Sequence, residues 1–244
     1  MRLCSARAKV SLSATFSGGI VSMSDSHIDL YLEGEERFDR FGSFIYTLFA
    51  RRGLRPLHEF ALREVVDEAL RTKPKRILDL GAGPGLLTCR LAQRLPEVEV
   101  YGVDPSPHML RQAEKIAVKM GVDNVHFKLG SSRVLPDLSF DIIYSVLSFH
   151  HWAKQAQALD QVYTHLSGGK FMVFEYNKDR LPFYYFPARG HAMRVKTFEE
   201  LKQHSRFSRL EVKEEGRLLL AIYVKEEEVG GERCGQMSGK PIVE

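Results

Sequence analysis

The segment that most constrains this chain is a glycine-rich turn, DLGAGPG at residues 79–85. A short apolar run at 76–78 precedes it, and a stretch of helical character at 86–95 follows it. This pattern predicts a strand that runs through the turn into a helix. Glycine lacks the Cβ atom that keeps a ligand away from the backbone, and a helix start offers free N–H groups. We therefore expect a site for a nucleoside-type ligand at the carboxyl end of a parallel strand.

The spacing of the glycines bears on which ligand fits. Dinucleotide-binding turns follow the pattern G-x-G-x-x-G/A, in which the third small residue allows close helix packing. Here Gly85 comes one residue early, and Leu86 stands where that pattern has its third small residue. The spacing argues against a nicotinamide dehydrogenase, and a purely structural turn is the alternative to a ligand site.

An acidic residue stands at the end of the next predicted strand. Residues 98–103 form an apolar run that ends at Asp104, roughly 20 residues after the glycine turn, where a carboxylate suits two ribose hydroxyls. The alternative is a solvated turn residue. Ser106 is the expected N-cap of the following helix, with Pro107 as its first residue and Gly121 as its stop.

As an ordered set, four motifs resemble those of class I S-adenosylmethionine-dependent methyltransferases, in particular the small-molecule, ubiquinone/menaquinone-methylase-like group. The resemblance spans about residues 55–225 and implies in-line transfer of a methyl group from S-adenosyl-L-methionine to a small, partly apolar acceptor. The matching motifs are DLGAGPG at 79–85, GVDPSPHML at 102–110, FDIIYSVLSFHH at 140–151 and LSGGKFMVFE at 166–175.

The resemblance also implies which residues bind the cofactor. The glycine turn would surround the methionine portion, the acid after the second strand would bind the ribose, and residues after the second and third strands would meet the adenine. Many relatives carry an acid where this chain has Ser131, whose hydroxyl accepts hydrogen bonds more weakly than a carboxylate. The expected cofactor residues are Asp79, Gly81, Gly83, Gly85, Asp104, Pro105, Met109, Ser131, Ser132 and Ser145.

Two adjacent histidines, His150 and His151, follow the predicted fourth strand and are the candidate catalytic residues. An imidazole can act as a general base near pH 7. The alternative is that one histidine packs beside the cofactor while the other hydrogen-bonds to the backbone. We expect no metal site, because adjacent residues of an extended chain point in opposite directions and no third ligand is evident.

The alternation of strands and helices predicts an α/β, doubly wound (Rossmann-like), mostly parallel seven-stranded sheet. An antiparallel C-terminal hairpin is expected from 207–214 and 218–225. We expect four parts: a disordered extension at 1–24 (a transit peptide is the alternative), an N-terminal helical cap at 25–74 over the ligand edge, a cofactor-binding domain at 75–225 and a flexible tail at 226–244. Aromatic residues of the cap and of the loops give a predicted substrate pocket of Tyr46, Phe149, Tyr184 and Tyr185.

Composition narrows the remaining functions. The net charge of +4 is mild and does not by itself require nucleic acid, although a basic cluster at 71–76 leaves RNA methylation as an alternative. Protein methylation and non-catalytic cofactor binding are further alternatives. The three scattered cysteines, Cys4, Cys89 and Cys234, favour a reducing, cytoplasmic location, and no apolar run is long enough to span a bilayer. The sequence leaves the oligomeric state open.

Overall fold

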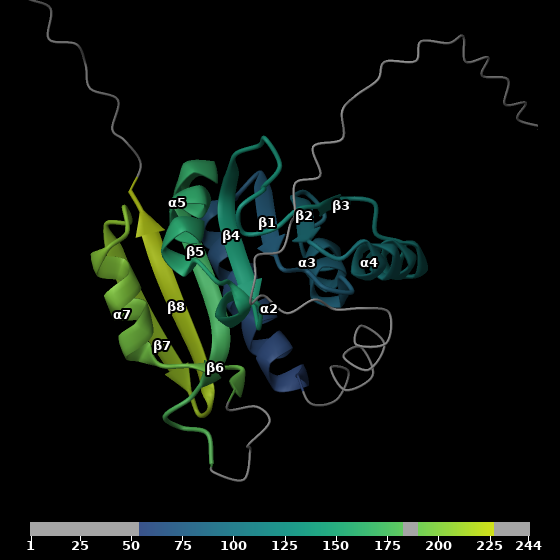
Figure 1. The fold of residues 1–244 in the computed structure, drawn as a ribbon. Coiled ribbons are helices and arrows are strands. Elements are labelled where there is room, and N and C mark those ends of the chain that lie inside the picture. The colour runs from purple at the N-terminus through teal and green to yellow at the C-terminus, as the bar shows by residue number, and fades with distance from the viewer. Residues whose placement is uncertain (1–53, 183–189, 227–244) are drawn as a thin grey trace, which may run out of the picture.

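The computed structural model describes residues 54–182 and 190–226, and its strands form one sheet in the order β3-β2-β1-β4-β5-β8-β7, with β6 paired to β5 (Figure 1). The strands from β1 to β6 pair in parallel, whereas β8 is antiparallel to both β5 and β7. The mostly parallel, doubly wound sheet and its antiparallel hairpin are thus confirmed, and β6 makes it eight-stranded rather than seven-stranded. The strands are β1 (Arg76–Leu80), β2 (Glu99–Asp104), β3 (Val125–Leu129), β4 (Phe140–Val146), β5 (Leu166–Asn177), β6 (Ala192–Met193), β7 (Arg209–Glu215) and β8 (Leu218–Lys225).

Helices cover both faces of the sheet, as the buried contacts show. One core cluster joins α2 and α3 to one face, and a second cluster joins α5 and α7 to the other. Neighbouring strand residues such as Ile142 and Ile143 belong to opposite clusters, because successive side chains of a strand point to opposite faces. The helices are α2 (Arg55–Thr72), α3 (Leu86–Arg94), α4 (Pro107–Met120), the short 3₁₀ helix η1 (Phe149–His151), α5 (Gln155–His165) and α7 (Val195–Gln203). No helix in the described ranges meets the length and apolarity that a membrane crossing requires.

Helix α2 lies on a face of the sheet, and this corrects our expectation that the whole of 25–74 caps the ligand edge. Its residues Leu57, Phe60 and Val65 are buried against β4, β5 and α3. The ring of Phe60 meets that of Phe174 edge-on, with the centroids 5.7 Å apart. A helix is stabilised by burying its apolar stripe, and the face of the sheet provides the apolar surface for this burial. Residues 25–53 of the expected cap lie outside the described residues.

Helix α4 begins and ends as its sequence predicts. The Ser106 hydroxyl accepts a hydrogen bond from the Met109 N–H, Pro107 is the first helical residue, and Gly121 ends the helix at φ +64°. These local signals confirm the start and stop of the helix that follows Asp104, and they fix the loop in which that acid lies.

Strand β4 leaves the side of β5 before β5 ends. Val146 is paired with Phe174, and Leu147 then adopts a left-handed conformation at φ +49° that turns the chain out of the sheet. Three residues further along β5, Asn177 pairs with Met193 of β6. Because β8 occupies the other side of β5, β6 continues the line that β4 has left. The register therefore leaves a gap between β4 and β6 beside Glu175.

Candidate active site

The glycine turn forms an open cradle at the carboxyl end of β1. Gly81 and Gly83 have φ values of +91° and +53°, a region that side chains with a Cβ rarely adopt. The N–H groups of Gly81 and Ala82 both donate to the Val103 carbonyl, at 2.8 and 3.0 Å, which ties the turn to the end of β2. A Cβ built on Gly83 would meet no atom within 4 Å, so this part of the turn faces free space that a ligand can fill.

The Asp104 carboxylate joins this turn to the loop after β2. It accepts hydrogen bonds from the backbone N–H groups of Gly83 and Ser106, both at 2.9 Å, and is only 8% exposed. Burial raises its pKa to about 6, although the two N–H groups act in the opposite direction. Each carboxylate oxygen keeps a second lone pair, so two ribose hydroxyls can still donate to it. The donor and acceptor groups of the turn thus fit an adenosyl ligand.

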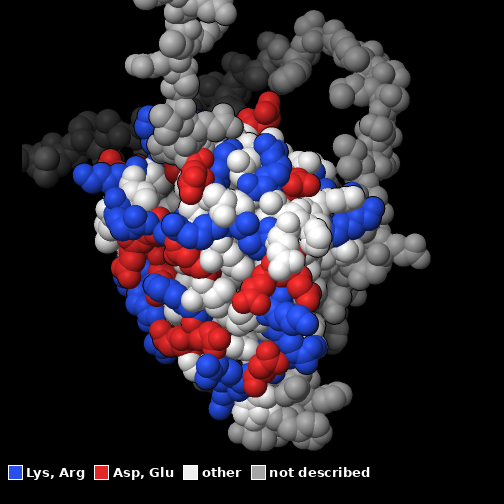
Figure 2. Space-filling model, turned by 90° about the vertical axis from the view of Figure 1, so that its left-hand side faces the viewer, with Lys and Arg blue, Asp and Glu red and all other residues white. Residues whose placement is uncertain are grey.

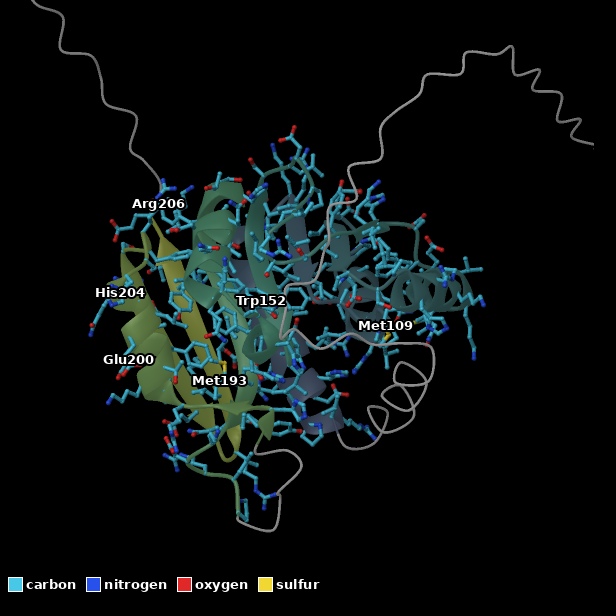
Figure 3. The ribbon with its side chains drawn as sticks, viewed as in Figure 1. Met109, Trp152, Met193, Glu200, His204 and Arg206 are labelled. Carbon is cyan, nitrogen blue, oxygen red and sulfur yellow. The ribbon has the colours of Figure 1, made fainter. Side chains whose placement is uncertain are left out.

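The residues predicted to meet the adenine lie at the ends of β2 and β3. Met109 lies in the first turn of α4 (Figure 3), Pro105 is half-buried, and Ser131 and Ser132 are buried. The Gly130 N–H donates to the Asp104 carbonyl at 3.3 Å, which holds the loop after β3 against the loop after β2. The Ser131 hydroxyl accepts from the Arg133 N–H at 3.3 Å. The structure therefore gathers these residues at one edge, and their contact with adenine stays a prediction.

Two further predicted cofactor residues, Ser145 and Gly85, have different surroundings. The Ser145 hydroxyl, near the carboxyl end of β4, is buried with no hydrogen-bond partner among the described residues, and its contact with the cofactor stays a prediction. Gly85 has φ +73°, and a Cβ there would lie 2.5 Å from that of Ala113 and 2.7 Å from Cζ of Phe127. Gly85 therefore packs the turn against α4 and β3, and its contact with the methionine portion stays a prediction.

Asp79 is buried beneath the first turn of α3, where its carboxylate accepts a 2.6 Å hydrogen bond from the Thr88 hydroxyl. Burial raises its pKa from 3.8 to about 7. The interaction with the methionine ammonium that the resemblance implies stays a prediction. Such a cation would stabilise the ionised carboxylate, whose burial is costly in the free protein.

Replacing Asp79 with asparagine is expected to stabilise the ligand-free protein at pH 8. Because the folded pKa lies above the unfolded value of 3.8, the folded state binds the proton more tightly, and the free energy of unfolding falls as pH rises from about 4 to about 7. Asn can still accept from Thr88 but carries no charge. Urea unfolding should show a gain of about 2–4 kcal/mol at pH 8 and little gain at pH 4. An equal gain at both pH values would contradict the raised pKa of Asp79.

The loop that leaves β4 packs directly against the glycine turn. A Cβ built on Gly81 would lie 2.1 Å from Oγ of Ser148, so only glycine allows this approach. The Ser148 hydroxyl also accepts a 3.2 Å hydrogen bond from the Trp152 indole N–H. The cofactor turn and the histidine-bearing helix η1 are therefore neighbours at the same edge of the sheet.

Phe149 does not line a substrate pocket, and that prediction was wrong. Its side chain is fully buried in the second core cluster, where its ring lies against those of Trp152, Phe171 and Phe198. The 3₁₀ turn directs this residue inward and so anchors η1 to the sheet. The other three predicted pocket residues, Tyr46, Tyr184 and Tyr185, lie outside the described residues.

His150 and His151 share one side of η1, which corrects the assumption of an extended chain. Their ring centroids are 3.9 Å apart, and the ring of His191, just before β6, lies 5.2 and 5.4 Å from them. Burial, followed by the nearby imidazoles of His150 and His191, lowers the pKa of His151 to about 3. His191 is thus a third candidate ligand that the sequence did not reveal, and its Nδ1 lies 3.2 Å from Nε2 of His150.

Glu175 is a second residue that the sequence analysis missed. Its carboxylate is completely buried, and both of its oxygens lie near Nδ1 of His150, at 2.9 and 3.1 Å. The His150 backbone N–H also points to it at 3.3 Å. The signal was available, because Glu175 is an acid at the end of the apolar run FMVF of a central strand. It fixes the orientation of the His150 ring and directs Nε2 toward His191.

Known proteins resemble this chain in both sequence and fold. The family model described as "Methyltransferase domain" matches residues 71–227, which is more than half of the chain. The demethylmenaquinone methyltransferase of Thermus thermophilus is 38% identical over 117 residues, covering 47% of this chain and 53% of that protein. The trans-aconitate 2-methyltransferase of Pseudomonas aeruginosa is 34% identical over 100 residues, covering 41% and 34%. The chain thus spans about half the length of the first of these curated relatives, and less of the second.

Solved structures show the same fold. A putative S-adenosyl-L-methionine-dependent methyltransferase from Methanococcus maripaludis superposes with a TM-score of 0.68 at 21% identity, covering 81% of this chain and 98% of that one. The plantazolicin methyltransferase BpumL, solved in complex with SAH, gives a TM-score of 0.64 at 16% identity over 78% and 91% of the two chains. The family model, the fold and the glycine turn agree: the chain belongs to the class I methyltransferase-domain family, whose cofactor is S-adenosylmethionine.

Proposed function

We propose that this protein transfers a methyl group from S-adenosylmethionine to a small, partly apolar acceptor. The observation that carries the proposal is the Asp104 carboxylate, which is bound to the Gly83 N–H at the open part of the glycine turn. In this position it can accept from both ribose hydroxyls while the turn adjoins the methionine portion. When bound, the cofactor supplies a methyl group already activated by a sulfonium.

The chain's own contribution is mainly to orient the two reactants and to exclude water. An activated methyl group needs an aligned nucleophile more than it needs further activation. The contact between Gly81 and Ser148 places the histidine loop beside the cofactor turn. His150 and His151 stay our proposed catalytic residues, since they follow this contact directly. Glu175 occupies Nδ1 of His150, so Nε2 is the atom that can accept a proton or bind an ion.

Two relatives suggest which acceptors to test first, a demethylated quinol and a small carboxylate. The quinol better fits the partly apolar acceptor that the aromatic-rich sequence at 31–49 and 183–186 favours. A nucleic-acid acceptor is less well supported. On the face shown in Figure 2, basic and acidic side chains are intermingled. Ion pairs such as Arg194–Asp179 and Lys213–Glu64 join residues of opposite charge, whereas RNA binding favours a basic stripe.

The test is an assay of acceptor-dependent formation of S-adenosylhomocysteine. The purified chain is incubated with S-adenosylmethionine and either a short-chain demethylmenaquinol or trans-aconitate, and the products are measured by mass spectrometry. We expect turnover with the quinol well above the background without acceptor. We also propose a cytoplasmic location, because the few scattered cysteines favour a reducing compartment.

Calorimetry separates the outcomes of this assay. Binding of S-adenosylhomocysteine without turnover on either acceptor, or on RNA or protein fractions, would favour a non-catalytic cofactor-binding protein. Tight binding of NAD with no response to S-adenosylhomocysteine would overturn the proposal. Turnover that continues after Asp104→Ala with unchanged KM for the cofactor would remove the observation on which it depends.

A further inference from the structure

Three imidazoles from two distant segments meet beside a buried carboxylate. His150 and His151 belong to η1, and His191 is the residue just before β6. One ring nitrogen of each lies within 4.8 Å of the others. We propose that these histidines form a binding site for one divalent transition-metal ion, with Zn²⁺ as the best-fitting species.

The distances between the nitrogen atoms suit such an ion. Nε2 of His150 and Nδ1 of His191 are 3.2 Å apart. With Zn–N bonds of about 2.0–2.1 Å, two ligands of a tetrahedral site lie about 3.3 Å apart. One pair of nitrogens already has this spacing, and the other separations, all within 4.8 Å, can close by rotation of side chains.

Glu175 supplies the partner that a metal-binding histidine usually has. It holds Nδ1 of His150 at 2.9 Å and leaves Nε2 directed at His191. A carboxylate that fixes the far nitrogen of a ligand is the usual outer contact of histidine–zinc sites, where it orients the ring and raises its basicity. Glu175 is also completely buried, and a buried carboxylate needs nearby positive charge. An ion on the other side of His150 would provide that charge.

The set of donors selects the kind of ion. Three imidazole nitrogens favour first-row transition ions and disfavour Mg²⁺ and Ca²⁺, which prefer oxygen ligands. Three protein ligands also leave one tetrahedral position open, as in catalytic zinc sites. The exposed side of His191 gives an ion access to this position from solvent.

The open position gives the ion a role that rests on the proposed function. Ser148, which contacts Gly81 of the cofactor turn, is two residues before His150. A hydroxyl oxygen of the acceptor, bound at the open position, would lose its proton to solvent more readily and become a better nucleophile. With an ion on Nε2, His150 would act as a ligand and not as a base.

The experiment measures metal binding directly in the full chain. Protein freed of metal by a chelator is titrated calorimetrically with ZnCl₂, and with CoCl₂ while its visible absorption is recorded. We expect one ion per chain, a four-coordinate Co²⁺ spectrum and no competition from Mg²⁺. His191→Ala should weaken Zn²⁺ binding by more than about 100-fold, since loss of an outer contact alone costs about 10–100-fold. Glu175→Gln should fall in that lower range.

His204→Ala is the matched control, because His204 is also exposed and lies at the end of α7 remote from Met193 (Figure 3). It should leave the Zn²⁺ affinity unchanged. No binding by the native chain, or equal losses in His191→Ala and His204→Ala, would overturn the proposal. Circular dichroism confirms that each variant is folded. Titration with S-adenosylhomocysteine in the same samples tests the cofactor site, so failure of the metal site and of the proposed function can be told apart.

Discussion

Gly85→Ala should destabilise the ligand-free protein by about 3 kcal/mol or more, whereas Gly83→Ala should cost only about 1 kcal/mol. Both residues have positive φ, so both variants are strained in the backbone. Only at Gly85 does the new methyl group meet other atoms, at 2.5 Å from Ala113 Cβ and 2.7 Å from Phe127 Cζ. The difference between the two variants therefore isolates the packing of the turn against α4 and β3.

Urea unfolding without cofactor measures both free energies. Gly83→Ala is the appropriate control because it makes the same chemical change in the same turn. Similar losses in the two variants would mean that Phe127 and Ala113 move aside, and that the closeness of the helix to the turn is not a requirement of the fold.

The second large effect is expected at Asp104. Its replacement by alanine should weaken binding of S-adenosylhomocysteine by about 100-fold, because two hydroxyl donors to a carboxylate are lost at about 1.5–3 kcal/mol each and water replaces part of this. Asp104→Asn keeps one acceptor oxygen and should lose less. Calorimetric Kd values for the three proteins give the comparison, and an unchanged Kd in Asp104→Ala would refute the ribose contact.

The pH dependence of the same Kd provides a second readout. The pKa of Asp104 is raised to about 6 by burial, and hydroxyl donors bind the ionised carboxylate better than the protonated one. Affinity should therefore fall as pH drops below about 6, by up to about tenfold per pH unit. This slope should be clearly smaller in Asp104→Asn, where Asp79 is the one of these two carboxylates that still titrates. An unchanged slope in the variant would assign the whole titration to another group, such as Asp79.

Sequence patterns predicted those parts of the fold whose chemistry is local. The glycine turn, the helix that follows Ser106 and the acid at the end of β2 each depend on residues within one or two turns of chain, and the structure places them as expected. The parallel sheet followed from the alternation of strands and helices. The same rules located the C-terminal hairpin, since residues 215–217 separate two strand-like runs, and the turn lies at 216–217 in the structure.

Features that depend on distant contacts were missed. Strand β6 has two residues, too few to show any periodicity, and α7 follows directly after it. The sequence therefore did not relate His191 to His150. The two residues are 41 positions apart in the chain, yet their ring nitrogens lie 3.2 Å apart in the structure. The orientation of Phe149 and His151 depends on the left-handed Leu147, which no propensity predicts for a leucine. Helix α2 was assigned to a cap because its apolar stripe does not say which surface it covers.

The change of strand beside β5 has a consequence for how the histidine cluster assembles. The imidazole rings are brought together only when β4 and β6 have both paired with the same edge of β5, β4 before Glu175 and β6 after it. Contacts between residues so far apart in the chain form late in folding, after the loop entropy has been overcome. The spectrum of a Co²⁺ ion bound at these nitrogens would therefore report the completed pairing of three chain segments, and refolding followed at that signal should lag behind the gain of helix.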